Sequence, residues 1–392
     1  MHSHPLIDSR SESCTNEYLR FQKPPSPERP PLKAIDLFSG AGGFSLGLSN
    51  AGFQVIGAFD NWGVAARTHA ANFGHPVHVC DLSQTSGSEL LDMIGVPSDS
   101  VDLVVGGPPC QGFSVQRIGS DHDARNNLVQ EYGRLISEIG PRLFLMENVP
   151  GLLGKRGKKL VEDFVTLLAE AGYETTWTII NAADYGVAQL RKRVVFAGWK
   201  IGMPSFEFPP PSFNSTSFRT VADALNGLPS PPIDLSPHPD DPLHRRTKLS
   251  SLNQRRIEII PPGGGMQDLP DDLKVDCHKV GAAKIGHRYV YGRLALDKPS
   301  ATITARFDSF TRGKFGHPAE ARNITLREGA RLQSFPDNFR FLGTQEEIAA
   351  QIGNAVPPLV AEAFARAAIE CLCTKLQSPA LHKQRTQLLL PA

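Results

Sequence analysis

The sequence lacks the features that mark secreted, membrane-spanning and metal-binding proteins. Its 392 residues include six cysteines but no Cys-x-x-Cys pair, which argues against a zinc site or a disulfide framework. No apolar run approaches the roughly 20 residues that a membrane span requires, and the polar start MHSHPLIDSR has no apolar core of a secretory signal. We therefore expect a cytoplasmic protein that binds neither a membrane nor a metal.

Net charge is also nearly missing. The chain has 41 basic and 40 acidic residues, a formal net charge of +1. This balance gives no support to a nucleic-acid partner, which would have to be inferred from local clusters of charge. The length allows one large domain and a smaller one.

Composition divides the chain into segments. Residues 1–32 end in PPSPERPP and are predicted to be a disordered, proline-rich lead-in. From 33 to 200, β-branched apolar runs alternate with helical patterns, which predicts an α/β fold with a doubly wound, mostly parallel sheet. Prolines interrupt 201–323, which we predict to be a smaller irregular domain. Helical signals in 324–375 complete the main domain, and 376–392 is expected to be a flexible tail.

The individual elements are predicted from apolar periodicity. Strands are expected at 33–38, 54–59, 77–79, 101–105, 142–146, 175–180 and 193–199. Helices are expected from residue 44 and at 64–73, 126–139, 158–171, 326–333 and 358–372.

A single cysteine follows one of these strands. The run VDLVV ends at Gly106-Gly107-Pro108-Pro109, and Cys110 comes next. Ligands of open α/β sheets collect at the carboxyl ends of strands, and the prolines hold the backbone before the thiol stiff. This placement indicates a nucleophile, with a buried structural cysteine as the alternative.

A glycine loop follows the first strand, where AIDLF runs into SGAGGF. Asp60 ends the next strand, placed to accept hydrogen bonds from a ribose, and Trp62 could stack on a purine. Asp81 follows the third strand and could face an adenine amino group. These residues predict an adenosine-bearing cofactor, but GAGGFS lacks the last small residue of the dinucleotide motif G-x-G-x-x-G/A.

Six ordered motifs carry a resemblance to a known family. In chain order they are DLFSGAGGFSLGL, GGPPCQGFS, MENVPG, QLRKRVVFAG, LREGARLQSFPDNF and QIGNAVPP. In these motifs and their order the chain resembles the DNA (cytosine-5)-methyltransferases. The resemblance implies a Rossmann-like fold that uses S-adenosyl-L-methionine to methylate carbon 5 of cytosine in double-stranded DNA. It also implies that 201–323 is the target-recognition domain of a bacterial or phage enzyme, which we expect to be associated with the nucleoid.

The resemblance assigns catalytic roles to four residues. Carbon 5 of cytosine is a poor nucleophile until a thiolate adds at carbon 6, and Cys110 is the candidate for this step. A free thiol has a pKa of about 8.5, so the site has to supply positive charge or a proton acceptor. By resemblance, Glu147 holds the ring nitrogen and exocyclic amine, and Arg193 reaches the carbonyl oxygen. Arg191 is expected to support the catalytic loop or a phosphate.

The resemblance also assigns binding residues, because the target base must leave the stack to be methylated. The cofactor is expected to contact Phe38, Ser39, Gly40, Gly42, Gly43, Asp60, Asn61, Trp62, Asp81, Leu82, Pro108, Leu128, Asn354 and Ala355. DNA is expected to contact Gln111, Ser114, Arg117, Arg125, Arg288, Thr302, Thr304 and Arg306. The helix after Asn354 is expected to pack against the glycine loop.

Basic residues cluster between positions 245 and 314, with aromatic residues among them. We interpret this set as a phosphate-binding patch, with an ordinary solvated surface as the alternative. Its members are Arg245, Arg246, Lys248, Arg255, Arg256, Lys284, His287, Arg288, Arg293, Arg306, Arg312 and Lys314.

The favoured hypothesis is a monomeric modification enzyme of a restriction-modification system, with any cognate endonuclease acting separately. A solitary regulatory DNA methyltransferase would carry the same motifs. A transfer-RNA methyltransferase is a further alternative, although the Cys-Phe-Thr tripeptide of that branch is missing from the sequence. A nicotinamide-dependent oxidoreductase or a silent DNA-binding regulator would leave Cys110, Glu147 and Arg193 without a role.

Overall fold

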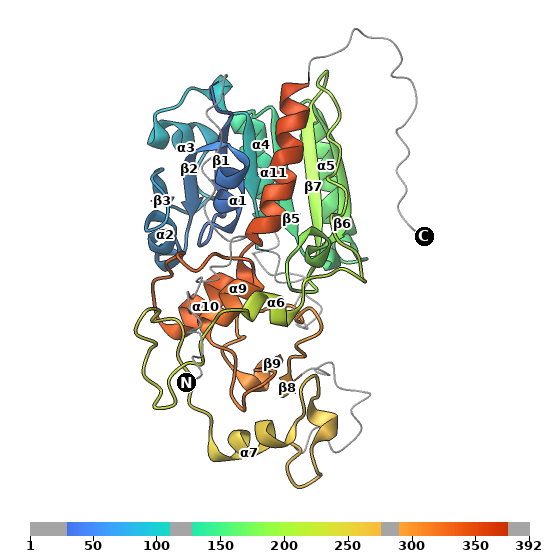
Figure 1. Cartoon of the computed structure of the whole chain (residues 1–392). Coiled ribbons are helices and arrows are strands. Elements are labelled where there is room, and N and C mark those ends of the chain that lie inside the picture. Colours follow the sequence, from blue (N-terminus) through green and yellow to red (C-terminus); the bar gives the residue numbers. More distant parts are fainter. Residues whose placement is uncertain (1–29, 110–127, 276–289, 375–392) are drawn as a thin grey trace, which may run out of the picture.

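A seven-stranded sheet forms the centre of the computed structural model, which describes residues 30–109, 128–275 and 290–374 (Figure 1). Its order is β3-β2-β1-β4-β5-β7-β6. β7 runs antiparallel to both of its neighbours, and the other pairs in the sheet are parallel. The expected α/β fold is confirmed. The strands are β1 (Lys33–Leu37), β2 (Gln54–Asp60), β3 (Val77–Val79), β4 (Leu103–Gly106), β5 (Leu143–Asn148), β6 (Tyr173–Asn181) and β7 (Lys192–Lys200).

Helices cover both faces of the sheet because successive strand residues point in opposite directions. Ala34 packs in one core with Phe364, whereas its neighbour Ile35 packs in a second core with Tyr132 and Phe164. In Figure 1, α11 crosses in front of the sheet and α4 lies behind it. The helices of this part are α1 (Gly43–Ala51), α2 (Gly63–Ala70), α3 (Gly87–Ile94), α4 (Leu128–Ile139), α5 (Lys158–Glu170) and α11 (Pro358–Cys373).

A second group of elements lies beyond the carboxyl ends of the parallel strands (Figure 1). Val221, Phe307, Phe335 and Ile352 share one buried core, so α9 and α10 pack with the irregular region rather than on the sheet. The division into domains stays a prediction. The elements here are α6 (Val221–Leu225), α7 (Ser251–Ile259), β8 (Gly292–Arg293), β9 (Lys314–Gly316), α9 (Leu326–Leu332) and α10 (Gln345–Asn354). Short 3-10 turns are η2 (Ser98–Ser100), η5 (Pro150–Leu153), η6 (Ala182–Tyr185), η7 (Met266–Asp268) and η9 (Phe310–Arg312).

Four of the described helices were not predicted from the apolar pattern, and these are α3, α6, α7 and α10. α3 begins at a capping box of Ser86 and Glu89, and α10 begins at one of Thr344 and Glu347. In each box the hydroxyl accepts a hydrogen bond from the third helical amide, and the carboxylate accepts one from the cap amide, so the sequence fixes where the helix starts. Among the described residues, no helix combines the length and apolar character that crossing a membrane requires.

Candidate active site

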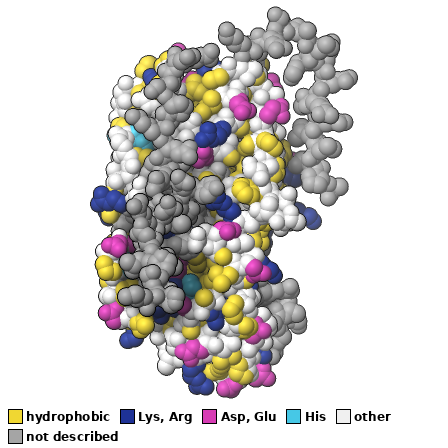
Figure 2. All heavy atoms as spheres, viewed as in Figure 1, with side chains coloured by type: hydrophobic (Ala, Val, Ile, Leu, Met, Phe, Trp, Pro, Cys, Tyr) yellow, Lys and Arg dark blue, Asp and Glu magenta, His cyan; other side chains and the backbone are white. Residues whose placement is uncertain are grey.

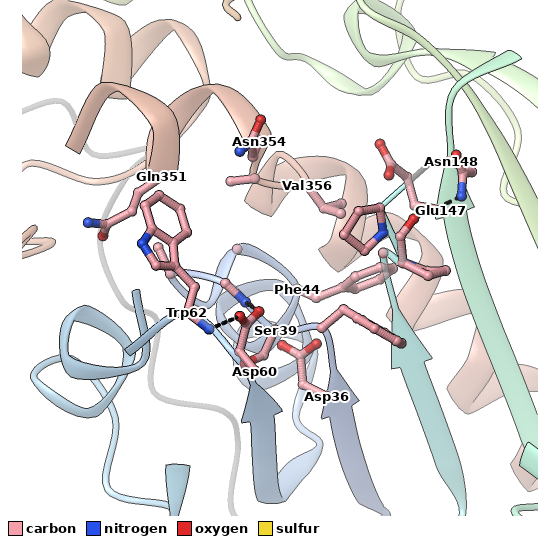
Figure 3. Close-up of a pocket in the computed structure, with 18 of the residues that line it drawn as sticks. Asp36, Ser39, Phe44, Asp60, Trp62, Glu147, Asn148, Gln351, Asn354 and Val356 are labelled. Atoms are coloured by element: carbon pink, nitrogen blue, oxygen red, sulfur yellow. Dashed lines mark hydrogen bonds between the residues drawn. The ribbon is translucent and has the colours of Figure 1, made fainter. Parts of the chain in front are cut away.

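A cavity of about 840 Å³ opens where β1, β2, β4 and β5 end (Figure 3). The loops after these strands form one wall, and residues at the end of α10 and before α11 form another. In Figure 3, Trp62 and Gln351 lie at one end of the cavity and Glu147 and Asn148 at the other, with Asp60 between them. This is the edge of the sheet at which the sequence predicted a ligand.

The glycine loop after β1 shapes the floor of the cavity. Phe38, Gly40 and Gly42 have φ angles of 53°, 52° and 96°, so the chain turns through left-handed conformations that favour glycine. A Cβ atom on Gly43 would lie 2.2 Å from the carbonyl oxygen of Val356. The loop can therefore approach the segment between α10 and α11 only because position 43 is glycine. Residues far apart in the sequence thus form one site.

Asp60 holds the glycine loop in place. One of its carboxylate oxygens accepts a hydrogen bond from the amide of Gly40 at 2.7 Å, and the other accepts one from the amide of Trp62 at 2.7 Å (Figure 3). Burial raises the pKa of this carboxyl group, against the effect of the amide donors. Each oxygen has a second lone pair, so the carboxylate can also accept a hydrogen bond from a ligand in the cavity. Asp81 lines the cavity too, and accepts hydrogen bonds from Ser83.

Two buried polar residues that were not predicted from the sequence also line the cavity. Asp36 lies within β1, is 1% exposed, and accepts hydrogen bonds from the amide and hydroxyl of Ser45. Gln351 is 2% exposed and donates to the carbonyl of Leu342, whereas its Oε1 has no donor among the described residues. A charged residue inside an apolar strand was the available signal for Asp36. For Gln351 the sequence offers no signal beyond its place in the motif QIGNAVPP.

Glu147 and Arg193 form an ion pair at the other end of the cavity, with 2.8 Å between Oε1 and Nε. Glu147 is the second-last residue of β5 and Arg193 is the second residue of β7, which pairs with β5, so the sheet itself places the two side chains near each other. Oε1 is buried and has no hydrogen-bond donor of good geometry among the described residues. It can therefore accept a hydrogen bond from a bound molecule.

Asn148 connects this end of the cavity to the Pro-Pro-Cys segment. Its side-chain amide donates to the carbonyl of Pro108 at 3.1 Å, and its oxygen accepts from the amide of Val149 at 2.8 Å. Both contacts fix the backbone beside Glu147. Cys110 follows Pro108 by two residues and lies outside the described residues.

Arg191 is buried at the junction of three segments. Its guanidinium donates to the carbonyls of Ile303, Gly353 and Ala355 at 3.0 to 3.2 Å. Burial, together with the charge of Arg193, lowers its pKa to about 9, so the group stays charged at neutral pH. These contacts hold β7, the residues around 303 and the end of α10 in one arrangement.

The comparisons with known proteins decide the family. The sequence model of the C-5 cytosine-specific DNA methylases matches residues 32–370. The chain belongs to this family. It is therefore a DNA (cytosine-5)-methyltransferase, as the ordered motifs predicted.

Curated relatives and solved structures agree with this assignment. The methyltransferase is 38% identical over 347 residues to the Type II methyltransferase M1.HphI of Haemophilus parahaemolyticus, covering 86% of this chain and 87% of that protein. It is 33% identical to the Type II methylase M.HgiDII of Herpetosiphon aurantiacus, and this match covers 85% of this chain and 93% of that protein. A prophage-encoded E. coli protein assigned as a DNA modification methyltransferase superposes with a TM-score of 0.64 at 30% identity, covering 87% and 99%. The fold is also that of the S. pombe Dnmt2 methyltransferase, which superposes with a TM-score of 0.61 at 18% identity. This match covers 88% of the present chain and 100% of the Dnmt2 chain.

The cavity of the methyltransferase brings together most of the residues expected at the cofactor. Gly42 does not line it, because this glycine faces the ring of Phe73, which would lie 2.7 Å from an added Cβ. Its contribution is the turn of the loop. The expected residues that do line the cavity are Phe38, Ser39, Gly40, Gly43, Asp60, Asn61, Trp62, Asp81, Leu82, Pro108, Leu128, Asn354 and Ala355.

The expected DNA contacts stay predictions. Thr302 donates a hydrogen bond to the carbonyl of Leu190 at 2.8 Å. Arg306 lines the cavity and forms ion pairs with Asp308 and Glu346 at 3.2 and 3.3 Å. Thr304 lies against Gly353 of α10. The other expected contacts fall outside the described residues and are Gln111, Ser114, Arg117, Arg125 and Arg288.

The proposed basic patch was wrong for two of its members. Arg293 is 7% exposed and donates to backbone carbonyls at the core of the irregular region. Arg256 is 6% exposed, donates to the carbonyl of Leu273, and lies 4.9 Å from the ring centre of Tyr291. These guanidinium groups satisfy carbonyls that would otherwise be buried without a donor. On the face in Figure 2, basic and acidic side chains are interspersed rather than gathered by sign.

Replacing Arg191 with methionine is expected to destabilise the fold. Three backbone carbonyls would lose the hydrogen bond from Arg191 in a buried setting, at roughly 1 to 3 kcal/mol for each group that stays unsatisfied. The carbonyl of Ala355 would keep a hydrogen bond from the side chain of Gln333. We therefore expect the free energy of unfolding to fall by about 3 kcal/mol in urea titrations. Arg366→Met is the matched control, because Arg366 is exposed and pairs with Glu362 on the surface of α11. An equal loss for both variants would show that the contacts of Arg191 do not stabilise the junction.

Proposed function

We propose that the enzyme transfers a methyl group from S-adenosyl-L-methionine to carbon 5 of a cytosine turned out of duplex DNA, through a transient bond between Cys110 and carbon 6. The observation that carries this proposal is the arrangement of one cavity. It is bordered by the Glu147–Arg193 pair, by the Pro108 segment leading to Cys110 and by the glycine loop with Asp60. A base and a cofactor could therefore meet there.

The residues at the glycine-loop end fit the cofactor. The Ser39 hydroxyl is buried without a hydrogen-bond partner among the described residues, which is costly unless a ligand supplies one. Asp60 offers acceptors for ribose hydroxyls, and Trp62 offers an aromatic face for adenine. The amino terminus of α1 suits the cofactor carboxylate. When bound, S-adenosyl-L-methionine supplies an electrophilic methyl group on a positively charged sulfur.

The residues at the Glu147 end fit the base. We propose that the Cys110 thiolate adds to carbon 6, which makes carbon 5 nucleophilic. Glu147 would hold the ring nitrogen and exocyclic amine through its carboxyl group, and would share a proton with the ring nitrogen while negative charge builds on the ring. Arg193 would keep that carboxylate oriented and reach the carbonyl oxygen of the base. After methyl transfer, the carbon-5 proton would pass to water and the electron pair of its bond would re-form the double bond between carbons 5 and 6. The Cys110 sulfur would leave with the electron pair of its bond to carbon 6, as a thiolate.

For the biological role, we propose the modification step of a restriction-modification system, acting on a specific double-stranded sequence. The support is the likeness to relatives that are named Type II methyltransferases. The target-recognition role of residues 201–323 belongs to the same proposal.

The experiment that tests this function follows tritium from labelled S-adenosyl-L-methionine. The purified chain is incubated with duplex DNA or with transfer RNA. We expect label in DNA alone, at carbon 5 of cytosine. Label in transfer RNA, or in neither, would contradict the proposal. Bisulfite sequencing of a genome from cells that express the chain would then show whether one sequence is methylated.

A further inference from the structure

Two carboxylates lie side by side at the glycine-loop end of the cavity (Figure 3). Asp36 belongs to β1 and Asp60 to the neighbouring β2. Asp36 receives hydrogen bonds only from Ser45, and Asp60 only from backbone amides, within the ranges that the structure describes. In the same ranges, neither forms an ion pair with lysine or arginine. Two carboxyl groups, one buried and one partly buried, thus lie together without a positive partner.

The positive groups of the cavity are engaged elsewhere. Arg193 pairs with Glu147, Arg191 donates to backbone carbonyls, and Arg306 pairs with acidic residues of its own region. The titratable groups whose charge acts on Asp36 are Asp60 from β2 and Tyr132 from α4. Neither of these can supply positive charge, so this end of the cavity favours a cationic ligand.

The raised pKa of the Asp36 carboxyl group agrees with this geometry. Burial raises the pKa of its carboxyl group to about 7, with a smaller increase from the charge of Asp60, while the hydrogen bonds from Ser45 act in the opposite direction. Near neutral pH the group is therefore partly protonated without a ligand. A cation in the cavity would favour the ionised form and drive the proton off.

We propose that Asp36 makes the cavity distinguish the methyl donor from its product by the charge on sulfur. The inference rests on the proposed use of S-adenosyl-L-methionine. In the transfer, the sulfur–methyl bond breaks with its electron pair left on sulfur, and a carbon–carbon bond forms at carbon 5. The sulfonium thereby becomes a neutral thioether. Asp36 loses its positive neighbour and takes up a proton, which weakens the hold on the product, S-adenosyl-L-homocysteine.

The expected signature is a pH-dependent preference. Both ligands carry the same amino and carboxyl groups, so the ratio of their dissociation constants isolates the charge on sulfur. Below pH 7, binding of the donor must displace a proton from Asp36, at a limiting dependence of about tenfold per pH unit. The preference for donor over product should therefore rise between pH 5.5 and 7.5, and level off above.

The test is calorimetric titration of the full chain, without DNA, at pH 5.5, 6.5, 7.5 and 8.5. The ligands are S-adenosyl-L-methionine, S-adenosyl-L-homocysteine and sinefungin, which carries an amine in place of the methylated sulfur. Sinefungin should follow the donor, because its amine is positively charged. In Asp36→Asn the preference should become flat with pH, and fall about tenfold at pH 7.5. Asp163→Asn, on the exposed face of α5, is the control and should behave as the unmodified protein.

A second measurement needs no variant, in case Asp36→Asn does not fold. At pH 6.5, titrations in two buffers of different ionisation enthalpy report the protons released. The donor should release more protons than the product. Equal release, a preference that does not change with pH, or an unchanged pH dependence in a folded Asp36→Asn would each overturn the inference while the proposed function stands. If neither ligand binds, the proposed function itself fails.

Discussion

Replacement of Cys110 with alanine is expected to abolish methyl transfer. Without the sulfur, carbon 6 of the target has no nucleophile, and carbon 5 keeps the aromatic character that makes it unreactive. We expect the single-turnover rate to fall by at least about 10⁴-fold, the scale seen when an enzyme loses its nucleophile. Binding of duplex DNA and of the cofactor should persist, because other residues line the cavity.

The matched control is Cys373→Ala. Cys373 is an exposed free cysteine at the end of α11, far in sequence from the Pro-Pro-Cys segment. Its replacement should leave the rate unchanged. Turnover of Cys110→Ala within tenfold of the unmodified enzyme would exclude a covalent role for this residue.

Replacement of Glu147 with glutamine is expected to have the next largest effect. The change keeps the size of the side chain but removes the carboxylate that the ion pair with Arg193 orients at 2.8 Å. Loss of a proton-transferring group typically costs about 10²- to 10⁴-fold in rate. We expect a loss of this size in single-turnover methylation, with little change in cofactor affinity, because Glu147 lies at the far end of the cavity from Trp62 (Figure 3).

A double-variant cycle separates chemistry from structure at this pair. Arg193→Met alone should cost about 10²- to 10³-fold through lost electrostatic stabilisation. Combined with Glu147→Gln, it should cost much less than the product of the two losses, because Arg193 acts partly through the same carboxylate. Fully additive losses would show that the two residues work independently. Glu162→Gln, an exposed change on α5, serves as the control.

The sheet and its catalytic edge could be predicted because their signals are local. A strand that is buried on both faces reads as a continuous apolar run, and a loop that passes close to other backbone requires glycine, as Gly43 does beneath Val356. The capping boxes of α3 and α10 are also local sequence signals, and they mark where each helix begins. Apolar periodicity alone did not predict either helix.

Other features depend on tertiary packing, which no local pattern encodes. Arg256 and Arg293 have the same sequence signature as surface arginines, yet both are buried against backbone carbonyls. Asp36 looked like one charge in an apolar strand, and only the fold shows that it lies beside Asp60 in a cavity. Which guanidinium is available to DNA and which carboxylate faces a ligand therefore depends on contacts between segments that are distant in the chain.

The central claim is that a cysteine sulfur bonds to the target base, and trapping that bond tests it most directly. Duplex oligonucleotides in which fluorine replaces the carbon-5 hydrogen of cytosine cannot lose that substituent as a proton, so the adduct should persist after methyl transfer. With S-adenosyl-L-methionine and DNA containing the recognised sequence, we predict a denaturant-resistant complex whose digestion places the modified nucleotide on Cys110. Methylation of ordinary DNA without any such complex, or with the nucleotide on another residue, would contradict the account.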